Sequence, residues 1–132
     1  QFVASAKAVI LAHEINPNNK VGCMIAGGAT YPYSCNPNDV LMAQKGMQMG
    51  NWLCGDVQCR GAYPAFADRF FTEKHITISK EAGDDEILKK GKVDFYSFSY
   101  YMSMTISSDP ESLPKDFRLG LADRPNRFEM VS

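Results

Sequence analysis

The chain has 132 residues, of which 45% are hydrophobic and 22% are charged. This length suits one compact domain, and the composition excludes disorder along the whole chain. The formal net charge of -1 argues against a generic nucleic-acid binder and against a polybasic protein of membrane surfaces. No apolar run approaches the roughly 18 residues of a membrane span, and the opening residues lead us to expect no secretory leader. We therefore expect a globular domain whose partner is neither a nucleic acid nor a membrane.

The four cysteines are Cys23, Cys35, Cys54 and Cys59. Their even number permits disulfides, but Cys23 lies in an apolar run and nothing indicates secretion, so reduced thiols in an intracellular protein are favoured. Cys54 and Cys59 have the spacing C-x4-C, with His75 further along the chain. A zinc site normally takes four ligands in tighter pairs, so we expect no metal site.

The first half of the chain reads as a helix over residues 2–14, a short buried strand over 21–26, a loop over 29–36 and a second helix over 37–54. Asn36 is the expected N-cap of the second helix, followed by proline at its first position. The predicted core positions are Phe2, Ala6, Val9, Ile10 and His13 in the first helix and Val40, Leu41, Met47 and Leu53 in the second.

The second half begins with residues 60–83, which we expect to be irregular. A short helix over 84–90 follows, because acidic side chains fill its first turn, lysines its last, and a glycine ends it. A strand runs from residue 93 to about 102. The segment 107–132 is rich in proline and charge, so we expect a poorly ordered end or a short docked helix.

The predicted strand over 93–102 separates its side chains onto two faces. The bulky face carries Tyr96, Phe98 and Tyr100, and the other face carries hydroxyl groups from Ser97, Ser99 and Tyr101.

This order of elements predicts an α/β fold with a parallel pair of strands. Two parallel strands have little stability alone, and their outer edges would present unpaired backbone groups. Either another chain supplies neighbouring strands or the remainder of the fold lies outside this sequence.

Three stretches carry a specific pattern: ASAKAVILAHEINPNNKVGCMIAGGATYPYSCNPNDVLMAQ (residues 4–44), DVQCRGAYP (56–64) and GKVDFYSFSYYMS (91–103). Through them the chain resembles glycoside hydrolase family 1, most closely its 6-phospho-β-glucosidases, over residues 1–108. Residues 109–132 form a tail that does not match the family, and we expect this tail to be flexible.

The resemblance implies a fragment of a (β/α)8 TIM barrel, because a complete barrel needs about 250 residues. It identifies residues 2–14 as the helix after the fourth strand, 21–26 as the fifth strand and 93–101 as the sixth.

The resemblance also implies retaining hydrolysis of phosphorylated β-glucosides in the cytoplasm, with no cofactor. That chemistry needs a carboxylic acid and a nucleophilic carboxylate about 5–5.5 Å apart. The family carries them in the motifs T-[FL]-N-E and E-N-G, and neither motif occurs in the 132 residues. We therefore expect no catalytic residue in this chain, which should be inactive on its own.

Two substrate-site residues follow from the resemblance. The sixth strand of the family usually ends in Asn-Tyr-Tyr, and its second tyrosine reaches the nucleophile. Here the matching residues are Ser99, Tyr100 and Tyr101. Tyr101 is therefore the expected partner of the nucleophile, and Ser99 replaces the asparagine.

Two alternatives stay open. The chain could be a non-catalytic module that forms a homo-oligomer through its exposed strand edges. It could also belong to an unrelated enzyme that has re-used the same scaffold.

Overall fold

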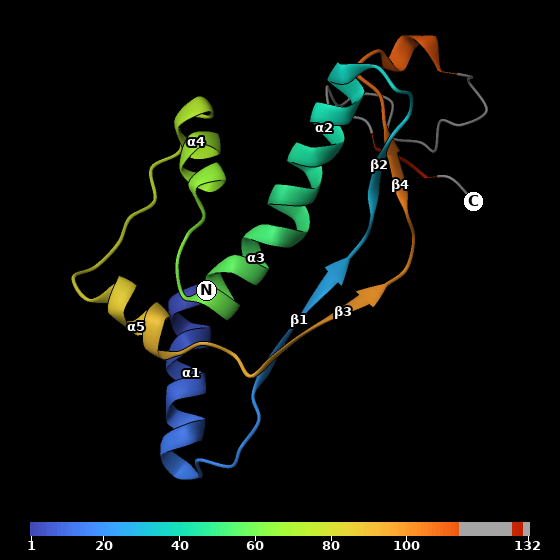
Figure 1. The fold of residues 1–132 in the computed structure, drawn as a ribbon. Helices are drawn as coiled ribbons and strands as arrows, with labels where there is room; N and C mark the ends of the chain where they lie inside the picture. Colours follow the sequence, from blue (N-terminus) through green and yellow to red (C-terminus); the bar gives the residue numbers. More distant parts are fainter. Residues whose placement is uncertain (114–127, 131–132) are drawn as a thin grey trace. The chain divides into compact units, whose positions relative to one another are not determined.

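The computed structural model describes residues 1–113 and 128–130, shown as a ribbon in Figure 1. The helices are α1 (Phe2–Ile15), α2 (Pro37–Met47), α3 (Leu53–Gly55), α4 (Ala65–Glu73) and α5 (Asp84–Lys90), with π-helical turns at Gln48–Trp52 and Asp56–Arg60 and a 3-10 turn at Pro110–Ser112. The strands are β1 (Gly22–Gly27), β2 (Thr30–Pro32), β3 (Phe95–Tyr100), β4 (Met104–Ile106) and β5 (Phe128–Met130).

The chain divides into two compact units. Unit 1 consists of Gln1–Ile25 and Trp52–Ser99, and unit 2 consists of Ala26–Asn51 and Tyr100–Ser132. Most of the tail predicted after residue 108 lies outside the described residues, so the boundary at that residue stays a prediction.

Four predicted elements are confirmed with small shifts: α1, β1, the beginning of α2, and α5. Asn36 caps α2 as expected, since its side chain accepts a hydrogen bond of 2.9 Å from the backbone N–H of Asn38. Acidic residues fill the first turn of α5 and lysines its last turn. Local signals were sufficient here because caps and dipole charges act within one helical turn.

The predicted irregular segment 60–83 is wrong, because α4 lies within it. This helix has no side-chain cap at Pro64, which removed the usual signal of a helix start. An i,i+4 ion pair of 2.8 Å between Arg69 and Glu73 supports it, and Tyr63 and Phe71 pack edge to face.

The predicted loop 29–36 contains β2, and the predicted strand 93–102 is shorter than expected and is followed by β4. Strands β2 and β4 have three residues each, too few to show an alternating pattern of side chains in the sequence. They form because they pair in parallel across a long separation, with Thr30 opposite Met104 and Pro32 opposite Ile106. Strand β5 pairs antiparallel with β4.

The second predicted helix begins correctly but continues to Arg60 through two π-helical turns. The core positions Val40 and Leu41 are wrong, because these side chains are 46% and 49% exposed. The buried residues of α2 are instead Asp39 and Ala43, which lie four residues apart on one helix face.

The core of unit 1 forms around Ala6, Val57 and Leu88, from α1, the second π-helical turn and α5. Helices α1 and α5 approach closely at Gly91, where a Cβ would overlap with backbone atoms of Ala6. Gly61 ends the long helix at φ 75°, and a Cβ there would lie 2.6 Å from the carbonyl oxygen of Leu88. Both glycines are therefore required by packing, and Gly61 also by its left-handed backbone.

Strands β1 and β3 form a two-stranded sheet, and their arrows run in the same direction in Figure 1. The predicted parallel pair is thereby confirmed. The backbone N–H of Asp94 donates a hydrogen bond of 2.8 Å to the Val21 carbonyl, and the Ser97 hydroxyl donates one of 3.0 Å to the Cys23 carbonyl.

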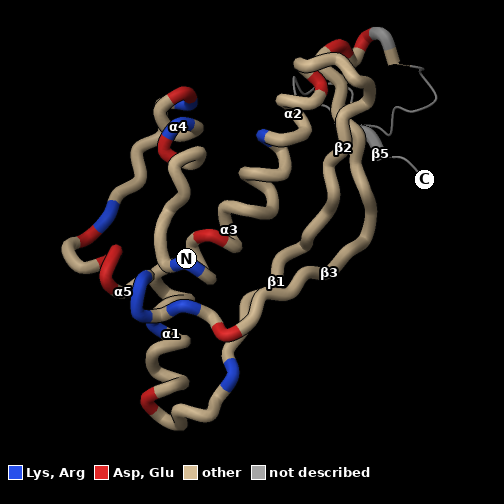
Figure 2. The backbone as a smooth tube through the Cα atoms, viewed as in Figure 1, with Lys and Arg blue, Asp and Glu red and all other residues tan. Residues whose placement is uncertain are grey.

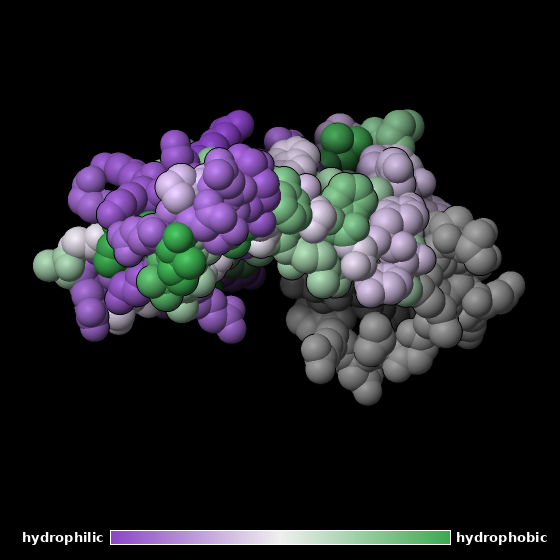
Figure 3. All heavy atoms as spheres, turned by 90° about the horizontal axis from the view of Figure 1, so that it is seen from below, coloured by the Kyte–Doolittle hydropathy of each residue, from purple (hydrophilic) through white to green (hydrophobic). Residues whose placement is uncertain are grey.

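The charged residues coloured in Figure 2 lie on helices and loops, and the strands β1, β2, β3 and β4 contain no charged residue. Hydrophobic side chains also reach the surface beside hydrophilic ones (Figure 3). The large exposed ones include Leu11, Ile15, Met24, Phe95, Phe98 and Tyr101. Met24, Phe95 and Phe98 are strand residues, so the sheet of β1 and β3 has large apolar side chains open to solvent.

We predict that Gly91→Ala destabilises unit 1 by about 1–3 kcal/mol, because the new methyl group must displace the backbone of α1. Urea unfolding followed by circular dichroism would measure this. The matched control is Gly50→Ala, where a Cβ meets nothing within 4 Å, so the variant should be neutral or more stable by up to about 1 kcal/mol. Equal stability of Gly91→Ala and the unaltered chain would contradict this account of the contact.

Candidate functional site

The candidate site lies where β1 and β3 end, because the resemblance predicts that they are strands of a parallel barrel, and such barrels carry the active site at the carboxyl ends of their strands. Ser99 is the penultimate residue of β3, and its hydroxyl lies 3.5 Å from the sulfur of Met24 on β1. Tyr101 directly follows β3, and its side chain is 74% exposed. Both predicted site residues are thus at the end of a strand, and their roles toward a substrate stay predictions.

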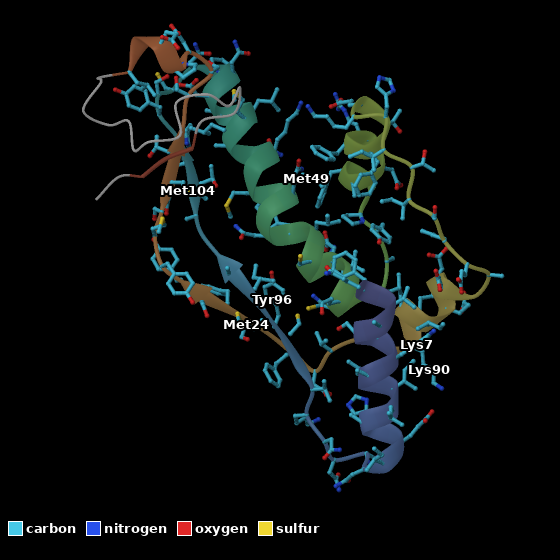
Figure 4. The ribbon with its side chains drawn as sticks, turned by 180° about the vertical axis from the view of Figure 1, so that it is seen from behind. Lys7, Met24, Met49, Lys90, Tyr96 and Met104 are labelled. Atoms are coloured by element: carbon cyan, nitrogen blue, oxygen red, sulfur yellow. The ribbon has the colours of Figure 1, made fainter. Side chains whose placement is uncertain are left out.

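Tyr96 occupies the other side of the strand pair, toward α3 (Figure 4). A Cβ built on Gly55 would lie 3.7 Å from its ring, an ordinary van der Waals distance, so the tyrosine packs beside Gly55. Burial raises the pKa of Tyr96 to about 12, with smaller contributions from Cys54 and Cys23. The phenol therefore stays neutral at physiological pH.

The segments that follow β1 and β3 lie against each other in unit 2. The N–H of Met104 donates to the Ala29 carbonyl at 2.7 Å, and a Cβ on Gly28 would lie 3.1 Å from the Met102 carbonyl oxygen. The side-chain amide of Asn51 donates a hydrogen bond of 2.8 Å to the Gly28 carbonyl. These contacts fix the backbone of two strand-end segments.

Asp39 is a buried carboxylate that the sequence analysis did not identify as a site residue, and its side chain is 3% exposed. One oxygen accepts hydrogen bonds from the Ser34 hydroxyl at 2.7 Å and backbone N–H at 3.2 Å. The other accepts from the Ser108 hydroxyl at 2.6 Å and N–H at 2.7 Å. These bonds, those from Ser108 foremost, lower the pKa of Asp39 to about 2.

Asp39 therefore holds together the loop after β2 and the loop after β4. Its place in the first turn of α2, close behind the N-cap and Pro37, is one local signal in the sequence. The five-residue spacing from Ser34 could have indicated one half of the cluster. The contact with Ser108, 69 residues away, follows only from the fold.

Neither a metal site nor a membrane helix emerges from the described residues. No group of three or more His, Cys, Asp or Glu side chains in residues 1–113 could hold a metal ion. The four cysteines carry free thiols, and His75 is exposed. Among the helices described, none is long and apolar enough to cross a membrane.

We predict that Asp39→Asn lowers the melting temperature at pH 7, because an amide replaces a charged acceptor of four hydrogen bonds. Since the folded pKa is depressed, the stabilisation is present above the unfolded pKa of about 4 and is lost as the pH falls toward about 2. Melting curves of variant and unaltered chain should therefore converge toward pH 2.

The control is Asp68→Asn on α4, where the carboxylate is exposed. This substitution should leave the difference between melting temperatures small at every pH. A gap between Asp39→Asn and the unaltered chain that stays constant from pH 7 to pH 2 would refute the electrostatic explanation.

Comparison with known proteins places these observations in a family. The sequence profile described as Glycosyl hydrolase family 1 matches residues 1–124. The chain is 56% identical over 109 residues to the 6-phospho-beta-glucosidase AscB of Escherichia coli. This alignment covers 83% of the chain and 23% of AscB. The chain is 49% identical over 115 residues to the aryl-phospho-beta-D-glucosidase BglH of Bacillus subtilis, covering 87% and 24% respectively.

The fold has the same relatives. The family 1 β-glucosidase of Thermotoga maritima superposes with a TM-score of 0.65 at 22% identity, over 98% of this chain and 26% of that one. The chain is therefore an α/β fragment of a (β/α)8 barrel, as the sequence predicted, and it spans about a quarter of the length of its curated relatives.

Proposed function

Since this chain belongs to glycosyl hydrolase family 1, we propose that it is a barrel segment of a cytoplasmic phospho-β-glucosidase. The observation that carries the proposal is the 56% identity over 109 residues to a 6-phospho-β-glucosidase. Identity at this level between aligned segments supports a common fold and a common substrate class. The substrate we propose is a phosphorylated β-glucoside, hydrolysed without a cofactor.

Within that enzyme, Tyr101 and Ser99 would form part of the wall that faces the substrate. Their position supports this role, because both lie at the carboxyl end of a barrel strand. The exposure of Tyr101 leaves its hydroxyl accessible to a group from another part of the barrel. We propose that this hydroxyl donates a hydrogen bond to the nucleophilic carboxylate, which would hold that carboxylate ionised and oriented.

The reaction itself needs two carboxyl groups about 5–5.5 Å apart, one to protonate the leaving oxygen and one to attack the sugar carbon. The motifs that supply them in the family, T-[FL]-N-E and E-N-G, do not occur in this sequence. Asp39 does not substitute for either group, because its oxygens are occupied by the two serines. We propose that the 132 residues contribute substrate contacts and no catalytic carboxylate.

We expect the purified chain to release no nitrophenol from a chromogenic 6-phospho-β-glucoside above the rate in buffer, because the acid and the nucleophile supply most of the chemistry. Intact AscB from Escherichia coli is the positive control. Turnover that persists after repeated purification, and that varies between variants of the chain, would overturn the proposal that this segment is inactive alone.

A second candidate function is a non-catalytic module that associates with itself. The observation that favours it is the two-stranded sheet of β1 and β3, in which each strand has a single paired neighbour among the described residues. An unpaired edge can accept a strand from another copy.

If this second candidate is right, the mass measured by light scattering should rise from monomer toward dimer as the concentration increases, and phosphorylated glucosides should not stabilise the chain. A monomer across the whole concentration range, with binding of an apolar dye, would exclude it in favour of the barrel segment.

A further inference from the structure

Three of the four cysteines lie in unit 1, and each comes from a different element. Cys23 is in β1, Cys54 is in α3 and Cys59 is in the second π-helical turn. We call these three side chains the thiol cluster. All three are free thiols, of which Cys59 is exposed and the other two are half-buried. Neither the proposed function nor the hydrophobic core of unit 1 accounts for them.

Alternation along β1 decides which face of the strand pair carries Cys23. Its two neighbours in β1 lie on the same face as Phe95 and Ser99. A Cβ on Gly22 would overlap with the Phe95 ring, and the sulfur of Met24 lies 3.5 Å from the Ser99 hydroxyl. Successive side chains of a strand point to opposite faces, so the side chain of Cys23 lies on the other face.

That other face turns toward α3. It carries Tyr96, which alternates with Phe95 along β3 and points toward α3 (Figure 4). The Tyr96 ring lies 3.7 Å from the position of a Cβ on Gly55, the residue that directly follows Cys54. Cys54 is therefore in the helical turn that packs against this face of the strand pair.

Backbone hydrogen bonds hold Cys59 beside the beginning of the same strands. The carbonyl of Gln58, the preceding residue, accepts a hydrogen bond of 3.0 Å from the N–H of Val93. The next N–H, that of Asp94, donates a hydrogen bond of 2.8 Å to the Val21 carbonyl. The turn that carries Cys59 and the segment that leads into β1 are thus bonded to two adjacent residues, so they meet at this point.

The electrostatics of the cluster agree with this placement. The pKa of Cys23 is raised by burial first, and then by the negative charges that Cys59 and Cys54 carry when ionised. Burial also raises the pKa of Tyr96 to about 12, with added contributions from the same three thiols. Interactions between charges weaken with distance, so these four side chains are neighbours in unit 1.

We propose that the thiol cluster is an oxidation site at which hydrogen peroxide joins Cys23 and Cys59 in a disulfide. Cys59 is the exposed thiol and meets the oxidant first. Its thiolate attacks one peroxide oxygen, the O–O bond breaks, and the released hydroxide takes up the thiol proton as water. The Cys23 sulfur then attacks the sulfenic acid on Cys59, the S–S bond forms, the S–O bond breaks and a second water leaves. Two thiols are oxidised and one peroxide is reduced.

The second step is favoured by the neighbouring position of the two thiols. Burial raises the pKa of both Cys23 and Cys59, so each thiol alone reacts slowly with peroxide at neutral pH. A sulfenic acid on Cys59, once formed, has the Cys23 thiol beside it and reacts without a diffusional encounter. The disulfide would close the chain between β1 and the π-helical turn, which restricts the unfolded chain and stabilises unit 1.

The test uses the 132-residue chain with Cys35→Ser, which removes the exposed cysteine of unit 2 and leaves the thiol cluster intact. After treatment with hydrogen peroxide and alkylation of free thiols, trypsin should yield residues 21–45 joined to residues 46–60, with the alkyl group on Cys54. The urea midpoint should shift upward, and dithiothreitol should reverse both changes. Cys54 in the disulfide, or a midpoint that shifts downward, would overturn the proposal.

The matched variants are Cys23→Ser and Cys54→Ser, each made in the Cys35→Ser chain. Both replace a half-buried thiol by a hydroxyl, and circular dichroism checks the fold of both. Cys54→Ser should keep the disulfide. Cys23→Ser should lose it and accumulate the sulfenic acid of Cys59, which dimedone captures as a stable adduct.

The outcomes decide between a paired oxidation site and three separate thiols. Equal dimedone capture at Cys59 with and without Cys23 would overturn the proposal, because the sulfenic acid would then have no neighbouring thiol. A disulfide between Cys54 and Cys59 in the Cys23→Ser chain, formed as fast as the original one, would overturn it as well. The peptide map of the Cys35→Ser chain gives the answer even if the other two variants fail to fold.

Discussion

The carboxylate of Asp94 joins three parts of unit 1 and thereby sets the geometry of the strand pair. It accepts a hydrogen bond of 2.8 Å from the backbone N–H of Val21 and one of 2.9 Å from the ring of His13, and Lys20 lies 3.6 Å away. The backbone N–H of Asp94 donates in return to the Val21 carbonyl. These hydrogen bonds lower the pKa of Asp94, so the carboxylate stays charged at physiological pH.

This arrangement matters because parallel strands cannot be joined by a short turn. More than 60 residues separate β1 from β3, and they include α2, α3, α4 and α5. A register error of one residue would turn each side chain of β3 to the other face. By fixing Asp94 beside Val21, the chain ensures that Tyr96 meets Gly55 and that Phe95 covers Gly22.

Asp39 has a related function in unit 2, where it joins two loops instead of two strands. Its two oxygens each accept from one serine, so the loop after β2 and the loop after β4 share a single carboxylate. Loops at the carboxyl ends of barrel strands form the substrate site in this fold class. A buried acceptor at this place orders the two loops that follow β2 and β4.

The assignment to family 1 and the exposed strand surfaces are consistent with each other. A two-stranded parallel sheet has little stability of its own, and its apolar residues remain open unless other strands cover them. The same residues that look like defects in an isolated domain, such as Met24 and Phe95, have an ordinary place in the interior of a barrel.

The sequence by itself determined the elements whose signals are local. The helix of α1, the cap at Asn36, the charge order of α5 and the apolar run of β1 depend on neighbours within one turn or on alternation, and pattern reading found them. Through three specific sequence stretches it also determined the family. Only the tertiary structure decided β2 and β4, the burial of Asp39 in place of Val40, and the joining of Asp94 to His13. Each of these depends on a partner 69 to 81 residues away, as in the Asp39–Ser108 and His13–Asp94 contacts, and no local pattern encodes which distant group will arrive.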